Sequence, residues 1–68
     1  MNESKADKTV LVTGANSGVG FEAAAQLAEA GWGTVILACR SEAKGEAARK
    51  QLIERVGKDV FVTLVIFL

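Results

Sequence analysis

The 68-residue sequence contains no histidine, no tyrosine and no proline, and it has a single cysteine. One thiol, Cys39, cannot form the disulfide framework on which small secreted domains depend. Without histidine or further cysteines, no zinc site of ordinary ligand spacing can form either. These absences exclude a disulfide-rich secreted domain and a zinc module, so we predict no metal site. They favour a reduced setting, and we expect a cytoplasmic protein.

An excess of charge of one sign is also missing, since 8 basic residues balance 8 acidic ones. A balanced chain without a basic stripe lacks the electrostatic footprint of a nucleic-acid-binding protein. The longest apolar run, Val60 to Leu68, is interrupted by Thr63 and is far shorter than the roughly 20 residues that a membrane-spanning helix needs. We therefore expect no nucleic-acid partner and no membrane span, and a ligand has to be recognised by a local site.

Apolar runs separated by glycines predict three strands and two helices. The polar segment 1–8 contains nothing that could anchor it and is expected to be a flexible tail. After it, β-branched runs indicate strands, alanine-rich or capped stretches indicate helices, and Gly31 and Gly57 close the two helices. The predicted order is a strand from Thr9 to Thr13, a helix over Phe21–Ala30, a strand over Thr34–Cys39, a helix from the N-cap Ser41 through Val56, and a strand over Val60–Leu68.

The second predicted helix is amphipathic. Its apolar residues are expected to face inward: Ala43, Ala47, Leu52 and Val56. Its charged residues are expected to remain in water: Glu42, Lys44, Glu46, Arg49 and Lys50.

This alternation of strands and helices is typical of an α/β fold with a parallel sheet built from two crossover units. With the strands side by side, two right-handed crossovers place both helices on the same face of the sheet. The other face would then be bare, although the strands carry apolar residues on both faces. We therefore expect part of a larger domain that has been truncated, and we expect the bare face to need further chain or self-association to cover it.

The connection between the first strand and the first helix reads Thr13-Gly14-Ala15-Asn16-Ser17-Gly18-Val19-Gly20. A turn at this place presents backbone N–H groups and the positive end of the helix dipole, which together suit a pyrophosphate. Gly14 permits the tight turn, Gly18 permits the phosphates to approach, and Gly20 permits close packing of the helix. Asn16 and Ser17 can add side-chain hydrogen bonds. The predicted cofactor-binding residues of this loop are Gly14, Ala15, Asn16, Ser17, Gly18, Val19 and Gly20.

Two alternatives apply to this loop. It could be a glycine-rich turn without a ligand. It could also be a loop for a nucleoside triphosphate, but such a loop needs Lys-Ser/Thr after its last glycine, where this chain has Phe21 and Glu22.

The spacing Thr-Gly-x-x-x-Gly-x-Gly, with Val10-Leu11-Val12 before it, resembles the cofactor motif of the short-chain dehydrogenase/reductase family. The resemblance extends over about Thr9 to Gly57. The segment Thr13 to Gly20, followed by Val35 to Arg40, is most similar to the branch that contains retinol dehydrogenases and protochlorophyllide reductase. It implies that residues 9–68 are the N-terminal βαβαβ part of a Rossmann-type, doubly wound dinucleotide-binding domain.

The cofactor type is expected to depend on the end of the second strand. An acidic residue about 20 positions after the glycines favours NAD(H), whereas an arginine attracts the 2′-phosphate of NADP(H). Cys39 and Arg40 occupy these positions, so NADP(H) is favoured over NAD(H). Ser41 is expected to be a second hydrogen-bond donor to the 2′-phosphate. The alternative for Arg40 is a solvated charge beside Glu42. Cys39 is interpreted as a small neutral filler.

The family's catalytic residues have no counterpart in this chain. The resemblance implies a Tyr-x-x-x-Lys pair as the proton-transfer machinery, but the sequence contains no tyrosine. It also implies an aspartate near the end of the third strand that meets the adenine, where Val65 to Leu68 is wholly apolar. We assign no catalytic residue. The leading hypothesis is the NADP(H)-binding part of an oxidoreductase, inactive alone; the alternatives are a non-catalytic interaction fragment and a non-functional truncated product.

Overall fold

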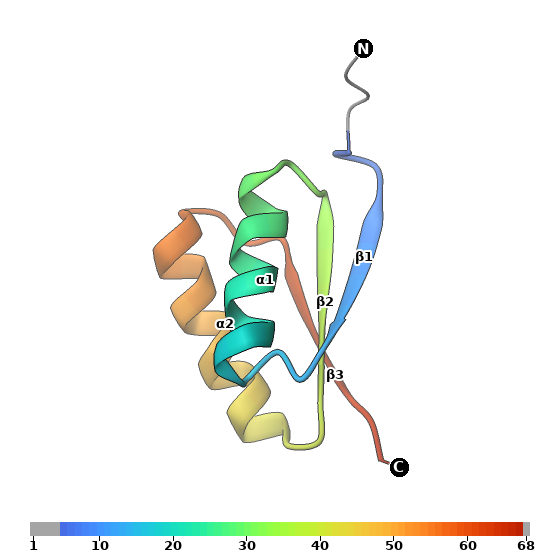
Figure 1. The fold of residues 1–68 in the computed structure, drawn as a ribbon, viewed down its shortest axis with the longest axis vertical. Coiled ribbons are helices and arrows are strands. Elements are labelled where there is room, and N and C mark those ends of the chain that lie inside the picture. Colours follow the sequence, from blue (N-terminus) through green and yellow to red (C-terminus); the bar gives the residue numbers. More distant parts are fainter. Residues whose placement is uncertain (1–4, 68) are drawn as a thin grey trace.

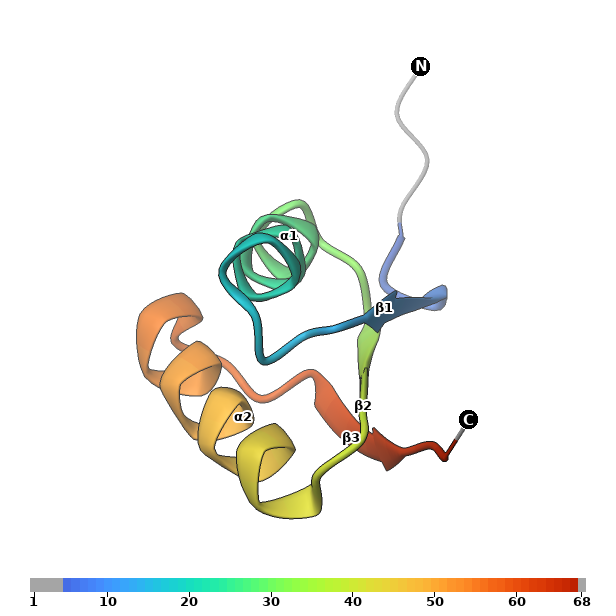
Figure 2. The same ribbon diagram turned by 60° about the horizontal axis from the view of Figure 1, so that its bottom comes forward.

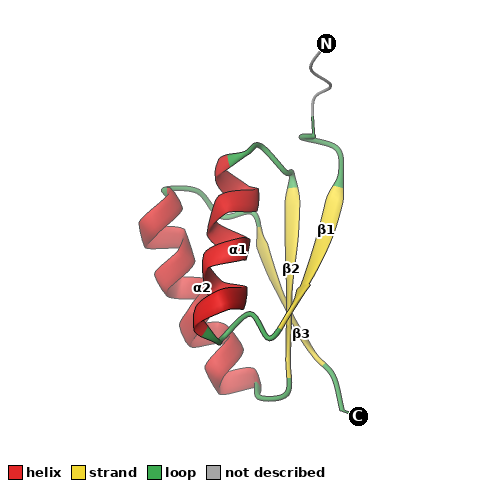
Figure 3. Cartoon of the chain, viewed as in Figure 1, coloured by secondary structure: helices red, strands yellow, loops and turns green. Residues whose placement is uncertain are grey.

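The computed structural model describes residues 5–67, and all five predicted elements are present in it. Figure 1 follows the chain through them, and Figure 3 colours the helices red and the strands yellow. The elements are β1 (Thr9–Thr13), α1 (Gly18–Glu29), β2 (Thr34–Cys39), α2 (Glu42–Val56) and β3 (Phe61–Val65).

The three strands form one parallel sheet in the order β1-β2-β3. Both helices cover the same face of this sheet, as Figure 2 shows. This arrangement follows from two right-handed crossovers between neighbouring parallel strands. The predicted α/β class and the βαβαβ order are therefore confirmed.

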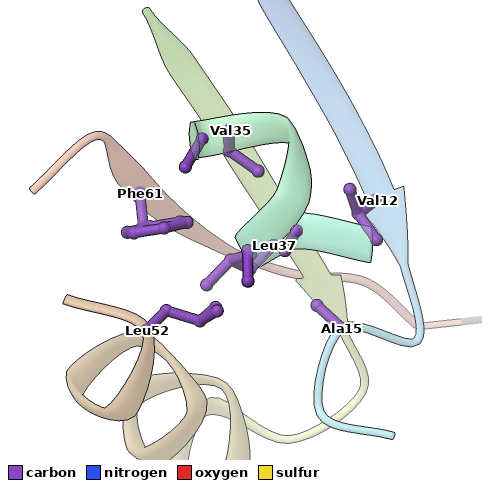
Figure 4. Packing of buried hydrophobic residues seen from close by; sticks show 9 residues of the cluster. Val12, Ala15, Val35, Leu37, Leu52 and Phe61 are labelled. Atoms are coloured by element: carbon purple, nitrogen blue, oxygen red, sulfur yellow. The ribbon is translucent and has the colours of Figure 1, made fainter. Parts of the chain in front are cut away.

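The core lies between the sheet and the two helices. Val35 and Leu37 of β2 and Leu52 of α2 are fully buried. Figure 4 shows these side chains gathered with Phe61 of β3 between the sheet and the helices. Burying a side chain of this size stabilises a fold by about 1.5–3 kcal/mol, so β2 and α2 anchor the molecule. Small residues of α1, among them Ala24 and Ala28, are also buried and let this helix approach the sheet closely.

Helix α1 begins earlier than the sequence predicts. It starts at Gly18 rather than Phe21, because Ser17 adopts an extended conformation and caps it, with its Oγ accepting a hydrogen bond from Gly20 N at 3.4 Å. Strand β3 ends at Val65, earlier than predicted, and Leu68 lies outside the described residues. Gly31 and Gly57 follow the ends of the two helices as predicted, and both are left-handed, with φ of +103° at Gly31 and +85° at Gly57.

The predicted inner face of α2 is wrong in part. Ala43 and Ala47 are exposed, whereas Gly45, Ala48 and Leu52 are buried. A Cβ atom at Gly45 would lie only 2.5 Å from the Cys39 Sγ atom and 2.7 Å from the Thr63 Cγ2 atom. The helix turns its glycine to the sheet because the strands leave no room there for a methyl group.

Two charged residues predicted to remain in water, Glu46 and Arg49, are half-buried. The Arg49 guanidinium donates to the backbone oxygen of Phe61 at 3.0 Å and to the Asp59 carboxylate at 2.6 Å. A charge-assisted pair of this kind fixes the loop that leads from α2 into β3.

The described part of the predicted N-terminal tail, residues 5–8, forms hydrogen bonds. Lys5–Lys8 forms a turn in which Lys8 N donates to Lys5 O at 3.0 Å. Gly33 N also donates to Lys5 O, at 2.9 Å, and Thr34 N donates to Lys8 O at 3.2 Å. The Lys5 ammonium lies 6.0 Å from the centre of the Trp32 ring. These contacts hold residues 5–8 against the start of β2, and residues 1–4 lie outside the described part of the chain.

The face of the sheet opposite the helices is apolar and uncovered. Leu11 of β1, Ile36 of β2 and Val62 of β3 are register partners and alternate with the core residues of their strands. Leu11 is 49% exposed and Val62 is 51% exposed. This row of side chains has no covering element among residues 5–67.

Candidate functional site

The carboxyl ends of the three strands meet at the bottom of Figure 1. A pocket of about 450 Å³ lies at this edge of the sheet. This volume lies within the range of small-molecule sites, which is about 300–1,000 Å³. The segments that follow the three strands and the start of α2 form the wall, which consists of Thr13, Gly14, Asn16, Ala38, Cys39, Arg40, Ser41, Lys44 and Ile66. The carboxyl edge of a parallel sheet is the usual ligand-binding edge of doubly wound folds.

Two backbone hydrogen bonds join the three strand ends across the end of β2. Gly14 N donates to Ala38 O at 3.0 Å, and Ile66 N donates to Cys39 O at 2.9 Å. The loop after β1 and the segment after β3 are therefore fixed on opposite sides of the β2 end. The pocket has a rigid base formed by backbone.

The loop after β1 is organised by Ser17. Its hydroxyl group donates to Gly14 O at 2.7 Å and accepts from Gly20 N at 3.4 Å, while its backbone oxygen accepts from Phe21 N at 2.8 Å. The Ser17 side chain thus holds the loop in shape. Asn16 is the residue of this turn whose side chain remains available, because it is exposed and lines the pocket.

The three glycines of this loop differ in what their missing side chains allow. Gly14 has a φ of +63°, which residues with a Cβ atom rarely adopt. A Cβ atom at Gly20 would lie 2.2 Å from the Gly14 backbone oxygen, so this glycine is required by the loop itself. At Gly18 an added Cβ would meet nothing within 4 Å. Packing within the chain therefore does not explain why residue 18 is a glycine. Open space lies beside Gly18 in the first turn of α1.

The first turn of α1 suits an anion. The first four amide groups of a helix have no acceptor within the helix, and Ser17 satisfies those of Gly20 and Phe21. No acidic side chain lies in the first turn of this fully described helix, so its positive dipole end is not neutralised. The Ala15 side chain is buried in the core, and Val19 is exposed, so both present only backbone polar groups here.

The connection between β2 and α2 carries cationic and hydroxyl groups. Arg40 is exposed, and Ser41 caps α2 by accepting a hydrogen bond from Lys44 N at 3.3 Å. That bond uses an acceptor site of the Ser41 hydroxyl and leaves its proton free to donate. Within residues 5–67, the arginine ion pairs involve Arg49 and Arg55 and not Arg40.

Lys44 is a site residue that the sequence analysis missed. The sequence predicts only that Lys44 lies on the solvent-exposed face of α2, yet it lines the pocket together with Arg40 and Ser41. The signal that could have identified it is its distance from the N-cap, since the third residue after the cap lies in the first helical turn above the preceding loop. Cys39 is buried, and its thiol donates to Ser41 O at 3.3 Å, which fits a packing role.

The described residues, 5–67, contain neither a metal-binding cluster nor a membrane-spanning helix. No group of three or more histidine, cysteine, aspartate or glutamate residues could hold a metal ion there. None of the helices in that part of the chain combines the length and apolar character needed to cross a bilayer.

Comparison with known proteins points to one family. Residues 8–66 match the family model described as short chain dehydrogenase. The short chain dehydrogenase/reductase mfmJ of Annulohypoxylon moriforme is 49% identical over 57 residues, which cover 84% of this chain and 17% of that protein. Human retinol dehydrogenase 13 is 56% identical over 45 residues, which cover 66% of this chain and 13% of that protein.

A solved structure agrees with these relatives. A short chain dehydrogenase from Escherichia coli CFT073, complexed with NADPH, superposes with a TM-score of 0.77 at 37% identity. The match covers 91% of this chain and 25% of that structure. The chain thus spans a quarter or less of the length of each of these three proteins. Because the family model covers nearly the whole sequence and the fold agrees, the chain belongs to the short-chain dehydrogenase/reductase family.

Proposed function

We propose that this chain is the NADP(H)-binding N-terminal part of a short-chain oxidoreductase and that it does not catalyse hydride transfer alone. In this proposal residues 9–68 are a partial dinucleotide-binding domain. The observation that carries the proposal is the pocket itself, in which a glycine loop at a helix N-terminus and the cations Arg40 and Lys44 line one cavity. NADP(H), when bound, would supply the hydride, and the residues here would hold its adenosine half.

The pyrophosphate is assigned to the first turn of α1. Backbone amides and an uncompensated helix dipole favour an anion there without a basic side chain. The open space at Gly18 supports this placement, because a phosphate can approach the backbone where a Cβ atom would otherwise stand. Asn16 is assigned to the same phosphates through its side-chain amide.

The preference for NADP(H) is assigned to the connection between β2 and α2. The adenosine ribose of a dinucleotide lies at the end of the second strand, where Arg40 and Ser41 follow Cys39. A 2′-phosphate there would meet the Arg40 guanidinium, the Lys44 ammonium and the free proton of the Ser41 hydroxyl. The related Escherichia coli structure, which is complexed with NADPH, supports a nicotinamide dinucleotide as the cofactor.

The absence of activity is proposed from the chemistry that is missing. Hydride transfer to or from a carbonyl needs a group that moves a proton, and in this family that group is a tyrosine beside a lysine. The sequence contains no tyrosine. The chain would therefore bind its cofactor and turn over no substrate.

A second candidate function is association through the uncovered face of the sheet. The exposed side chains of Leu11, Val62 and Leu64 favour it, because apolar surface of this kind marks interaction sites or aggregation. This candidate predicts concentration-dependent association in sedimentation experiments, unchanged by NADP+. Association that NADP+ alters would argue against a non-catalytic interaction role.

Titration calorimetry with NADP+ tests the leading proposal. Gly18→Val places a branched side chain in the space assigned to the phosphates, and we expect it to weaken binding by at least about tenfold, as expected for losing charge-assisted hydrogen bonds. The matched control is Ala30→Val, which adds comparable bulk at the exposed opposite end of α1. Full affinity in Gly18→Val, or an equal loss in the control, would remove the glycine loop from the site.

A further inference from the structure

We propose that Gly45 is a positioning residue for cofactor preference, because its missing side chain lets α2 lie close enough to the sheet for Ser41 and Lys44 to reach a 2′-phosphate. The inference rests on the proposed NADP(H) site and deepens it. Gly45 is not part of the pocket wall and acts through its neighbours. Its effect falls on the preference between NADP+ and NAD+ and not on dinucleotide binding in general.

Gly45 is buried where α2 packs against β2 and β3. A Cβ atom at this position would lie 2.5 Å from the Cys39 Sγ atom and 2.7 Å from the Thr63 Cγ2 atom. Both neighbours belong to the sheet, since Cys39 ends β2 and Thr63 is the middle residue of β3. Thr63 is β-branched, so its χ1 angle is restricted. A close-packed contact of this kind cannot absorb a methyl group, and an alanine here has to push α2 away from the strands.

The backbone oxygen of Ser41 connects this contact to the pocket. It accepts hydrogen bonds from Gly45 N at 2.9 Å and from the Cys39 thiol at 3.3 Å. The Ser41 hydroxyl group also accepts from Lys44 N at 3.3 Å. Ser41, Lys44 and Gly45 are thus joined in the first turn of α2. A shift of the helix at Gly45 therefore moves the two residues of this turn that line the pocket.

The first turn of α2 presents groups that only NADP(H) would use. In the proposed site, Ser41 and Lys44 face the 2′-phosphate, which NAD(H) lacks. Hydrogen bonds weaken steeply as their distance and angle depart from the optimum, and charge-assisted bonds are the strong ones. The pyrophosphate is assigned to a different element, the first turn of α1. Displacing α2 should thus weaken the binding of NADP+ and leave the binding of NAD+ nearly unchanged.

Titration calorimetry of the 68-residue chain and its Gly45→Ala variant with NADP+ and NAD+ tests this inference. We expect the preference for NADP+, measured as the ratio of the two dissociation constants, to fall by about tenfold, the effect of losing one charge-assisted hydrogen bond. An unchanged ratio would overturn the inference and leave the proposed function intact. Failure of the unmutated chain to bind either nucleotide would overturn both.

Gly33→Ala is the matched control. It also forces a methyl group into occupied space, against the Ala6 backbone oxygen, but it does so beside the amino end of β2. It should lower the Tm, as Gly45→Ala should, and leave the ratio of the dissociation constants unchanged. An equal fall of the ratio in this control would show that loss of stability, and not the position of α2, changes the preference.

A second pair of variants tests the same contact from β3 and decides the question if Gly45→Ala does not fold. Thr63 is outside the pocket wall, and its buried Oγ1 atom has no hydrogen-bond partner among residues 5–67. Thr63→Val therefore keeps the shape of the side chain without breaking a bond, whereas Thr63→Ile adds a methyl group beneath α2. We expect the ratio to fall by about threefold in Thr63→Ile and to stay unchanged in Thr63→Val. Equal ratios in these two variants would overturn the inference.

Discussion

The two strand-to-helix connections of this chain offer an anion two different kinds of surface. The loop after β1 has no charged residue between Thr13 and Gly20 and presents backbone amides, a helix dipole and the open space at Gly18. The connection after β2 presents side chains, with Arg40, Ser41 and Lys44 around the same pocket. Both loops precede a helix capped by a serine, yet only the second carries formal positive charge.

This difference teaches which part of a nucleotide each loop can recognise. Backbone amides fit the pyrophosphate that every dinucleotide carries, so the first loop cannot distinguish NADP(H) from NAD(H). Arginine and lysine side chains fit an additional phosphate, so the second loop can. General affinity and cofactor preference are thus assigned to separate loops, and mutations should separate them.

The largest expected effect is on cofactor preference. Arg40→Asp replaces the cation that we assign to the 2′-phosphate with an anion, and we expect the preference for NADP+ over NAD+ to fall on the order of 100-fold, from loss of one charge-assisted hydrogen bond plus repulsion. Affinity for NAD+ should persist, because the first loop is unchanged. Competition binding with both nucleotides measures this ratio.

The control for Arg40→Asp is Lys50→Asp, which makes the same charge change at an exposed position of α2 outside the pocket wall. If both variants shift the preference equally, the effect is one of overall charge, and the assignment of the 2′-phosphate to the second loop fails.

A stability effect separates two glycines within the first loop. Gly20→Ala forces a Cβ atom against the Gly14 backbone oxygen, a contact that rotation of a side chain cannot relieve. Overpacking of this kind costs about 1–3 kcal/mol and exceeds the gain in helix propensity, at most about 1 kcal/mol. We expect the Tm to fall by roughly 10 °C, measured by circular dichroism without ligand.

Gly18→Ala is the matched variant in the same helical turn. It should leave the Tm unchanged or raise it slightly, because no atom opposes the added methyl group and alanine favours the helix. Equal destabilisation by the two substitutions would mean that Gly18 also serves the fold, and its assignment to the ligand would lose its basis.

The smallest expected effect is a change in stability at an ion pair that lies outside both loops. Arg55 of α2 forms a bidentate pair with Glu22 of α1, with Nη2 at 2.8 Å from Oε1, and this hydrogen bonding lowers the pKa of Glu22. A lowered pKa in the folded state stabilises the fold above the carboxyl's unfolded value of about 4.3, and that stability is lost as the pH falls through the folded value.

Glu22→Gln should therefore lower the Tm slightly at pH 7, and the difference from the unmutated chain should vanish once the pH falls below the lowered pKa of Glu22. Cofactor preference should not change. Glu54→Gln, an exposed carboxylate elsewhere on α2, is the control and should show no such convergence. A difference that persists at low pH would show that packing, and not the ion pair, connects the two helices here.

Much of the fold could be predicted because strands and helices alternate with clear glycine boundaries. The error on α2 has a physical reason, since spacing alone favours Ala43 and Ala47, whereas the close approach of Cys39 and Thr63 admits only Gly45. The turn at Lys5–Lys8 was also missed, because its partners at Gly33 and Thr34 are distant in sequence.

The candidate site was predictable where a local motif encodes it. The spacing of glycines after the first strand predicts Gly14, Gly18 and Gly20, and the position after the second strand predicts Arg40. The contributions of Lys44 and Ile66 were not predicted, because each depends on how a later element returns to the edge of the sheet. Such neighbours become visible only when the strand order is known.

Thermal unfolding of the chain with NADP+ and with NAD+ tests the central claim most directly. A ligand that binds only the folded form stabilises it by about 2.7 kcal/mol at a hundredfold excess over its Kd. The account predicts a cooperative transition that NADP+ raises more than NAD+ does at equal concentration. A transition indifferent to both nucleotides would contradict it, since the loops would then have the family's sequence and shape without holding its cofactor.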